Sequence, residues 1–270
     1  MSSEKTDAII LRIVPFSESS VVLTILTRDF GKISALAKGA YRPKSPFEGA
    51  IDLGCHCRVV FIKKSSDALD LLIEAKLERR FRAANKSLRN LYAGYYVLEL
   101  LRELTETGQP QADLFDLALN TLIQIDAPQP DVVDLANLLT MFELQALRLL
   151  GHAPSMTDCA SCGKEVSESK MVAFGMISGG VLCPQCRPKE RSVVSISQTV
   201  RSAIRQQLQD ASNSLEQYSF VNCDQKRSAV TGELRAILGR YMSHHIGHEL
   251  KMRRFIDALQ LSHSSKSTIR

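Results

Sequence analysis

AIILRIVPFSESSVVLTILTRDFGKISALAK, residues 8–38, contains three short runs rich in Ile, Val and Leu, separated by polar residues and glycine. The runs cover residues 8–16, 20–27 and 32–38, and residues 57–64 and 68–77 repeat the pattern. Five strands at such short spacing predict a small sandwich or barrel. A five-stranded Greek-key barrel is the OB-fold, which binds oligonucleotides, although an SH3-like barrel would show a similar pattern.

The apolar period changes near residue 82, from short runs to steps of three and four residues. This period predicts helices over residues 87–106, 113–125 and 132–150, and again near 198–209, 226–247 and 251–261. Their apolar faces are broad enough for a helical bundle. The sequence therefore predicts an α+β protein, with a small five-stranded β-domain at 1–80 and a helical domain at 81–270.

The composition points to a cytoplasmic globular protein. The chain has 270 residues, of which 44% are apolar and 23% charged. The first residues, MSSEKTD, do not resemble a signal peptide, and no apolar run approaches the roughly 18 residues that would span a bilayer. Seven cysteines, an odd number in a long chain, favour metal binding or buried thiols over a disulfide framework.

Charge is unevenly distributed along the chain. Residues 1–82 carry a balance of +4, residues 83–150 a balance of −5 and residues 151–270 a balance of +6. This pattern is compatible with an anionic partner at the basic ends and a protein partner in the acidic middle.

The cysteines at 159–162 (CASC) and 183–186 (CPQC) form the strongest local motif. Four thiolates can occupy the corners of a tetrahedron around zinc, about 2.3 Å from the ion. Such a site leaves no open position for water, so we predict one structural Zn²⁺ rather than a catalytic one. The predicted ligands are Cys159, Cys162, Cys183 and Cys186, in a cysteine module at about 155–190. Free or disulfide-linked thiols are the alternative.

Other chemically reactive residues have simpler interpretations. Cys55 and Cys57 lack a second pair and are expected to be small buried hydrophobic residues. His244 and His248 lie four apart on a predicted helix, but HHIGHE does not match the metalloprotease spacing. Phosphate-binding, dinucleotide-binding and nucleophile-elbow motifs are missing from the sequence, so we predict a protein that is not an enzyme.

KGAYRPKSPFEG, residues 38–49, is a basic connector between the third and fourth predicted strands. Lys38, Arg42 and Lys44 can meet phosphates, and Tyr41 can stack on a base, which contributes about 1–3 kcal/mol. The prolines would reduce the entropy lost when the connector is ordered by binding. A solvated turn whose charges only aid solubility explains the composition equally well.

Four segments resemble the RecO family of recombination mediators, in that family's order. They are the connector and the residues after it (38–53), FELQALRLLGHAP with CASCG (142–163), FGMISGGVLCPQC (174–186), and LGRYMSHHIGHELKMRRFI (238–256). In the last segment Met252 stands where the family usually has a serine.

The resemblance implies an N-terminal five-stranded OB-fold DNA-binding domain at 1–80, a helical domain at 81–270 that carries the zinc module, and a DNA repair function. It implies binding of single- and double-stranded DNA without sequence choice, and annealing of complementary strands. It also implies protein partners. The partners are RecR, the single-stranded-DNA-binding protein and, indirectly, RecA. The candidate DNA-binding residues are Lys38, Tyr41, Arg42, Lys44, Lys63 and Lys64, and the location is cytoplasmic, with the nucleoid. The alternative is a non-catalytic adaptor that binds proteins through a zinc ribbon.

Overall fold

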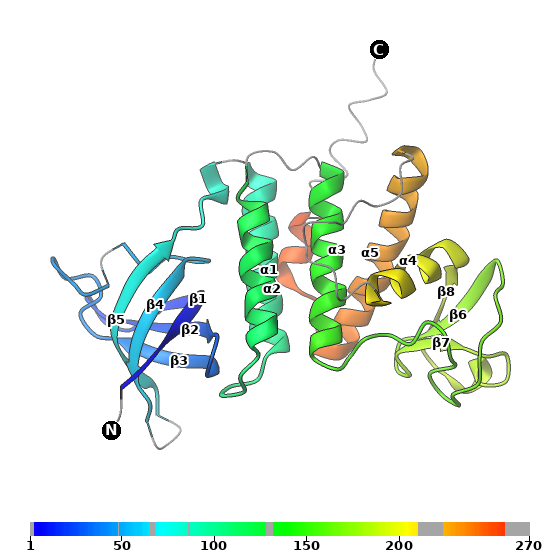
Figure 1. The fold of residues 1–270 in the computed structure, drawn as a ribbon, viewed down its shortest axis with the longest axis horizontal. Helices are drawn as coiled ribbons and strands as arrows, with labels where there is room; N and C mark the ends of the chain where they lie inside the picture. The colour runs from blue at the N-terminus through cyan, green and yellow to red at the C-terminus, as the bar shows by residue number, and fades with distance from the viewer. Residues whose placement is uncertain are drawn as a thin grey trace, which may run out of the picture. The chain divides into compact units, whose positions relative to one another are not determined.

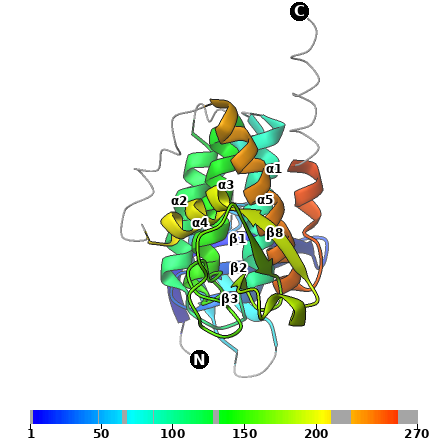
Figure 2. The same ribbon diagram turned by 90° about the vertical axis from the view of Figure 1, so that its right-hand side faces the viewer.

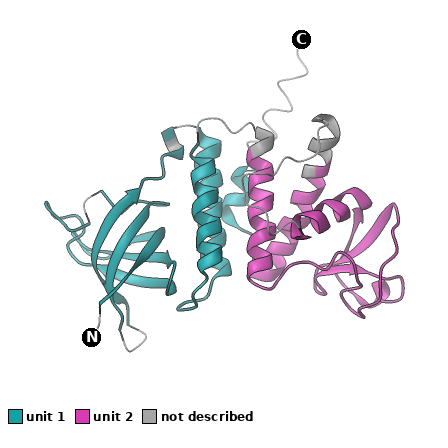
Figure 3. Cartoon of the chain, in the orientation of Figure 1, with its two compact units in different colours: residues 1–129, 250–270 teal, residues 130–249 magenta. Residues whose placement is uncertain are grey.

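The computed structural model describes residues 3–47, 49–64, 68–85, 87–127, 132–209 and 224–256. The chain divides into two compact units, residues 1–129 with 250–270 and residues 130–249 (Figure 3). The predicted domain boundary at residue 80 falls inside the first unit, between a barrel and the helices that pack on it.

Five strands of the first unit close into a barrel (Figure 1). They are β1 (Ser3–Pro15), β2 (Val21–Thr27), β3 (Gly31–Ala37), β4 (His56–Ile62) and β5 (Asp70–Arg79). The strand order is β1-β2-β3-β5-β4, with β3 and β5 parallel and the other neighbours antiparallel. The predicted five-stranded OB-fold barrel is confirmed.

Strand β1 begins at Ser3, before the apolar run that starts at residue 8. Its polar first residues pair with the end of β4, from Ser3 opposite Ile62 to Ile9 opposite His56. Backbone pairing, rather than apolar character, extends the strand. A bulge between Ile10 and Arg12 bends β1, so that its second half pairs with β2 and the barrel closes through one strand.

Alternate residues of each strand fill the barrel. The fully buried side chains include Leu23, Ile25, Val59 and Phe61, each at most 1% exposed. This alternation of buried and exposed positions is the period-two pattern of a strand with one face in a core.

Helices α1 (Leu88–Leu104) and α2 (Ala112–Ile125) pack on the barrel within the same unit. Ser87 caps α1, since its hydroxyl accepts a hydrogen bond from the Asn90 amide at 3.1 Å. The Arg28 guanidinium, between β2 and β3, donates two hydrogen bonds of 3.0 and 2.8 Å to the carboxylate of Asp116 on α2. The barrel is therefore tied to α2 by a bidentate ion pair.

The chain returns to the first unit near its end. Residues 251–256 are helical, and the buried carboxylate of Glu99 on α1 accepts hydrogen bonds from the backbone amides of Lys251 and Met252 at 3.0 and 2.8 Å. Glu99 thereby satisfies amides at the start of a helix that would otherwise lack partners. Phe255 packs against Tyr92 of α1, with ring centroids 5.3 Å apart.

The second unit combines helices with a small sheet. It contains α3 (Val132–Leu149), α4 (Gln198–Gln209) and α5 (Asp224–Ile246), together with β6 (Met171–Gly175), β7 (Gly180–Leu182) and β8 (Val193–Ser197). The strand order is β7-β6-β8. Strand β8 leads into α4 (Figure 2), and its last residue, Ser197, is bonded through its amide and hydroxyl to Glu233 of α5.

Two short 3-10 turns complete the described elements, η1 (Ala83–Asn85) and η2 (Arg187–Lys189). Among the described helices, none is both long enough and apolar enough to cross a membrane.

Candidate metal centre and nucleic-acid interface

The four cysteines of the two C-x-x-C motifs meet in the cysteine module. Their sulfur atoms all lie within 4.8 Å of one another, and the Sγ atoms of Cys162 and Cys183 are 3.8 Å apart. A tetrahedron of sulfurs about 2.3 Å from a zinc ion has edges of about 3.8 Å. Cys159, Cys183 and Cys186 are buried, and Cys162 is exposed. The cluster therefore has the ligand type, number and spacing to hold a metal ion.

Tight turns at glycine residues bring these sulfurs together. Gly163, with φ of 72°, follows the first pair, and its amide donates to the Cys159 carbonyl at 2.8 Å. The second pair follows the β6–β7 hairpin, in which Gly179 has φ of 75°. The amide of Cys183 donates directly to the sulfur of Cys159 at 3.4 Å. Glycines in the left-handed region thus shape the turns next to both cysteine pairs.

The local environment divides the thiols into different acid strengths. Burial opposes ionisation of Cys159, but amide hydrogen bonds, first from Cys183 and then from Ser161 and Cys162, lower its pKa to about 6. At Cys186 a bond from Ser161 lowers the pKa, but the sulfurs of Cys162 and Cys183 outweigh it and raise the pKa to about 11. The surroundings thus stabilise the thiolate of Cys159 and disfavour that of Cys186. A bound cation would stabilise all four thiolates together.

Arg201 of α4 ties together the backbone around the first cysteine pair. Its side chain is 2% exposed, and it donates hydrogen bonds to four carbonyl oxygens. These belong to Met156 and Thr157 before the pair and to Val166 and Ser167 after it, at 2.7–3.2 Å. Arg201 was not among the residues predicted from the sequence. Its position beside Val200 and Ile204, on the buried face of α4, is the signal that could have identified it.

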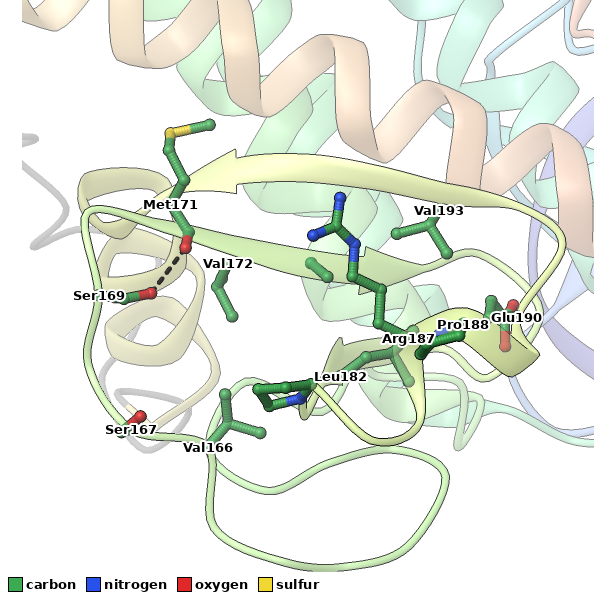
Figure 4. Close-up of a pocket in the computed structure, with 12 residues that line it drawn as sticks. Val166, Ser167, Ser169, Met171, Val172, Leu182, Arg187, Pro188, Glu190 and Val193 are labelled. Atoms are coloured by element: carbon green, nitrogen blue, oxygen red, sulfur yellow. Dashed lines mark hydrogen bonds between the residues drawn. The ribbon is translucent and has the colours of Figure 1, made fainter.

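A groove of about 680 Å³ lies within the cysteine module (Figure 4). Its apolar lining includes Val166, Val172, Leu182 and Val193. Arg187 extends from η2 toward the strands, as Figure 4 shows. The carboxylate of Glu190 is engaged elsewhere, because it accepts hydrogen bonds from the amides of Ile177 and Ser178 in the β6–β7 turn.

The remaining cysteines and histidines do not form a second metal cluster within the described residues. Cys55 and Cys57 are fully buried in the barrel, as predicted, and burial raises the pKa of Cys57 to about 12. The His245 ring packs against the rings of His152, in a tilted arrangement, and Tyr241, edge to face, with centroids 4.9 and 4.5 Å away. Burial first, and then the neighbouring histidines, lower the pKa of His245.

The connector of the barrel presents its cations and its aromatic residue to solvent. Lys38, Arg42 and Lys44 are exposed, and Tyr41 is 58% exposed. The ion pairs found among the described residues include none of these three cations. The structure therefore brings four of the predicted DNA-binding residues together on one solvent-facing turn.

The rest of the connector holds this turn in place. Ala40, Phe47 and Ala50 are buried in the barrel core, and the Pro46 carbonyl accepts a hydrogen bond from the Ala75 amide of β5 at 3.3 Å. Lys44 has φ of 60°, in the left-handed region that disfavours side chains other than glycine. Glycine would adopt this conformation without that penalty. Glu48 lies outside the described residues.

Lys63 and Lys64 follow β4 rather than β3. Lys63 is exposed and Lys64 half-buried, and the Lys64 amide donates to the Asp70 carboxylate at 2.8 Å. Residue Ile62 pairs with Leu71, whereas the end of β3 pairs with the other edge of β5. These two lysines are thus separated from the connector by the width of β5.

Two family descriptions match the chain and together cover most of it. Residues 1–81 match the family described as recombination protein O N terminal, and residues 85–254 match recombination protein O C terminal.

Curated relatives agree with this match. The chain is 46% identical over 200 residues to the DNA repair protein RecO of Rhodopirellula baltica, covering 74% of this chain and 73% of the relative. It is 33% identical over 261 residues to the DNA repair protein RecO of Anaeromyxobacter dehalogenans, covering 96% and 98%. It is 30% identical over 265 residues to that of Symbiobacterium thermophilum, covering 96% and 99%. The chain therefore belongs to the RecO family of DNA repair proteins.

Proposed function

We propose that this protein is a DNA repair and recombination mediator that binds single- and double-stranded DNA without sequence specificity. It anneals complementary strands and helps to load a recombinase on protein-coated single strands. The observation that carries the proposal is the anchored connector, which presents Lys38, Tyr41, Arg42 and Lys44 to solvent at the edge of an OB-fold barrel.

The chemistry of these side chains suits a nucleic-acid backbone. Lysine and arginine neutralise phosphates and release condensed counterions, which provides affinity without reading sequence. Tyr41 can stack on any base, since every base has a π-face. Lys63 and Lys64 extend the cationic surface across β5. A surface that neutralises two strands at once lowers their mutual repulsion, which favours annealing.

In this proposal the metal is one structural Zn²⁺, held by Cys159, Cys162, Cys183 and Cys186. Four thiolates fill a tetrahedral shell and leave no position for a reactive water. The ion fixes the two turns relative to each other and supplies folding free energy to the cysteine module.

The proposed partners follow from family membership. They are RecR, the single-stranded-DNA-binding protein and, indirectly, RecA, the recombinase whose loading is assisted. The proposed location is the cytoplasm, in association with the nucleoid.

The test combines charge reversal with a matched control. The variant Lys38→Glu, Arg42→Glu, Lys44→Glu should lose binding to a single-stranded oligonucleotide and lose annealing of complementary strands. The control reverses three exposed cations of the cysteine module, Lys164, Lys189 and Arg191, and should retain both activities. Equal loss in the two variants would mean that net charge, and not the connector, determines binding.

The groove in the cysteine module favours a second candidate function, a protein-binding adaptor. Its lining is largely apolar, with Arg187 extended across it. If this is the main function, Arg187→Glu should abolish association with RecR while leaving DNA binding unchanged. The connector variant should then bind RecR and DNA as the unchanged protein does.

A further inference from the structure

Four apolar side chains form a row across the outside of the barrel. Val14 of β1 is paired with Val22 of β2, Val22 with Leu36 of β3, and Leu36 with Leu71 of β5. Chain neighbours of Val22, Leu36 and Leu71 point inward, because Val21, Leu23, Ala35, Ala37 and Leu72 are buried in the core, and Val14 is itself 37% exposed. The row Val14, Val22, Leu36 and Leu71, called here the apolar row, therefore lies on the outer surface.

Exposed apolar residues are concentrated around this row. Nine large hydrophobic side chains of the described residues are exposed, and five of them belong to this end of the barrel: Val14, Phe16, Tyr41, Leu69 and Ile73. Phe16, at 64%, is the most exposed of the nine. A concentration of exposed apolar surface on one side of a protein indicates a binding surface.

Hydrogen bonds join the turn that carries Phe16 to the connector that carries Tyr41. The amide of Phe16 donates to the Ser20 carbonyl at 2.9 Å, which closes the β1–β2 turn. The amide of Tyr41 donates to the Ser19 carbonyl at 3.0 Å, and the amide of Gly39 donates to the Ser20 hydroxyl at 3.1 Å. The two exposed aromatic residues are thus carried by two segments that are bonded to each other.

We propose that single-stranded nucleic acid crosses the outer face of the barrel along the apolar row, and that Phe16 is a second base-stacking residue beside Tyr41. The inference rests on the proposed DNA-binding function and extends it to a residue and a surface outside the basic connector. Bases contact the aromatic rings and the apolar row, while phosphates meet the cations at its border.

Charge complementarity selects this occupant. Arg12 is exposed on the outer side of β1 and Lys38 is exposed directly after β3, and the ion pairs among the described residues include neither of them. Among the described residues, the exposed acids nearby include Glu18, at the tip of the β1–β2 turn, and Glu74 on β5. An apolar surface with aromatic residues inside and cations at the border matches a strand whose bases are unpaired.

The test is Phe16→Ala, with an oligothymidylate and an oligomer of the same length that lacks bases. Loss of a stacked base should weaken oligothymidylate binding by about 5- to 150-fold. The dependence of binding on salt should not change, because no phosphate contact is removed. The abasic oligomer should bind Phe16→Ala and the unchanged protein equally well. Leu88→Ala, at another exposed apolar residue of the same unit, is the control that should change nothing.

Two results would overturn the inference. The first is unchanged oligothymidylate binding by Phe16→Ala, including the case in which that variant instead loses RecR or the single-stranded-DNA-binding protein. The second is an equal loss of affinity for the oligothymidylate and the abasic oligomer. Neither result removes the proposed DNA-binding function, which is tested separately by the connector variant with three charge reversals.

Discussion

The cysteine module and the connector of the barrel are both irregular segments, but they direct their chemically important side chains in opposite directions. In the module, the sulfurs converge and Arg201 is buried among carbonyl oxygens. In the connector, small and aromatic residues such as Ala40 and Phe47 point inward, while Lys38 and Arg42 point outward.

The difference separates stability from binding. Polar groups that point inward are satisfied by the protein itself, so removing one leaves buried partners unsatisfied. Cations that point outward have only solvent as a partner, so replacing them has little effect on folding. We therefore expect substitutions in the module to change stability, and substitutions of the connector cations to change binding.

The largest effect should come from a zinc ligand. Cys162→Ser removes one of four thiolates, and the protein should lose its metal together with much of the roughly 10–16 kcal/mol of apparent binding free energy of such a site. Metal analysis should give close to one zinc per chain for the unchanged protein and none for the variant. Cys57→Ala, in the barrel, should keep the metal. A variant Cys162→Ser that retains full zinc would contradict the four-thiolate site.

A smaller loss of stability should follow removal of the Arg201 guanidinium. Arg201→Met keeps a long side chain but removes a hydrogen-bond donor from four carbonyl oxygens. The Thr157 carbonyl keeps the Val166 amide as a donor at 3.2 Å, so three carbonyls lose their donor, which should cost more than about 3 kcal/mol in the free energy of unfolding of the second unit. Zinc transfer to a chelator should also be faster, since the first cysteine pair is less well held. Denaturant unfolding checks the first expectation, and a colorimetric chelator checks the second.

The connector offers a contrast between two of its own residues. Phe47→Ala removes a core side chain that is 3% exposed and should lower stability by about 3 kcal/mol. Lys44→Gly should leave stability unchanged or raise it slightly, because glycine tolerates the φ of 60°. Thermal unfolding of both variants separates these effects. A destabilised Lys44→Gly would show that the lysine has a structural role.

The smallest effect concerns pH. The pKa of His245 is lowered in the folded protein, so the unfolded chain takes up a proton first as the pH falls below about 6.5. The second unit should therefore lose stability between pH 7 and pH 5. The variant His245→Phe should lose less stability over the same pH range, with His152, His244 and Tyr241 unchanged. Zinc content is measured at each pH as a control. An equal pH dependence of stability in both proteins would show that His245 is not the cause.

Much of the fold follows from local patterns in the sequence. The apolar runs and their period predicted the five barrel strands and the helices now seen as α1 to α5, because burial of one face determines both. Two C-x-x-C pairs predicted the cluster because the spacing itself sets the geometry. The family comparison confirms the DNA repair family.

Other features depend on contacts that are distant in the chain. Strands β6, β7 and β8 are short, and their pairing is not visible in a local period. Arg201 gains its role from carbonyls about 35 to 45 residues away. Phe16 lies beside the connector because the turn that follows it is bonded there. The Ser19 carbonyl accepts from the Tyr41 amide, and the Ser20 hydroxyl accepts from the Gly39 amide. The predicted DNA-binding residues and domain limits stay predictions.

The most direct test of the central claim is the salt dependence of single-strand binding by the unchanged protein and by Lys38→Glu, Arg42→Glu, Lys44→Glu. Each phosphate contact on a single strand contributes about 0.7 to the slope of log affinity against log salt. We expect a steep linear decrease for the unchanged protein and a slope about two smaller in magnitude for the variant. Affinity that stays constant between low and moderate salt, or identical slopes for the two proteins, would contradict it.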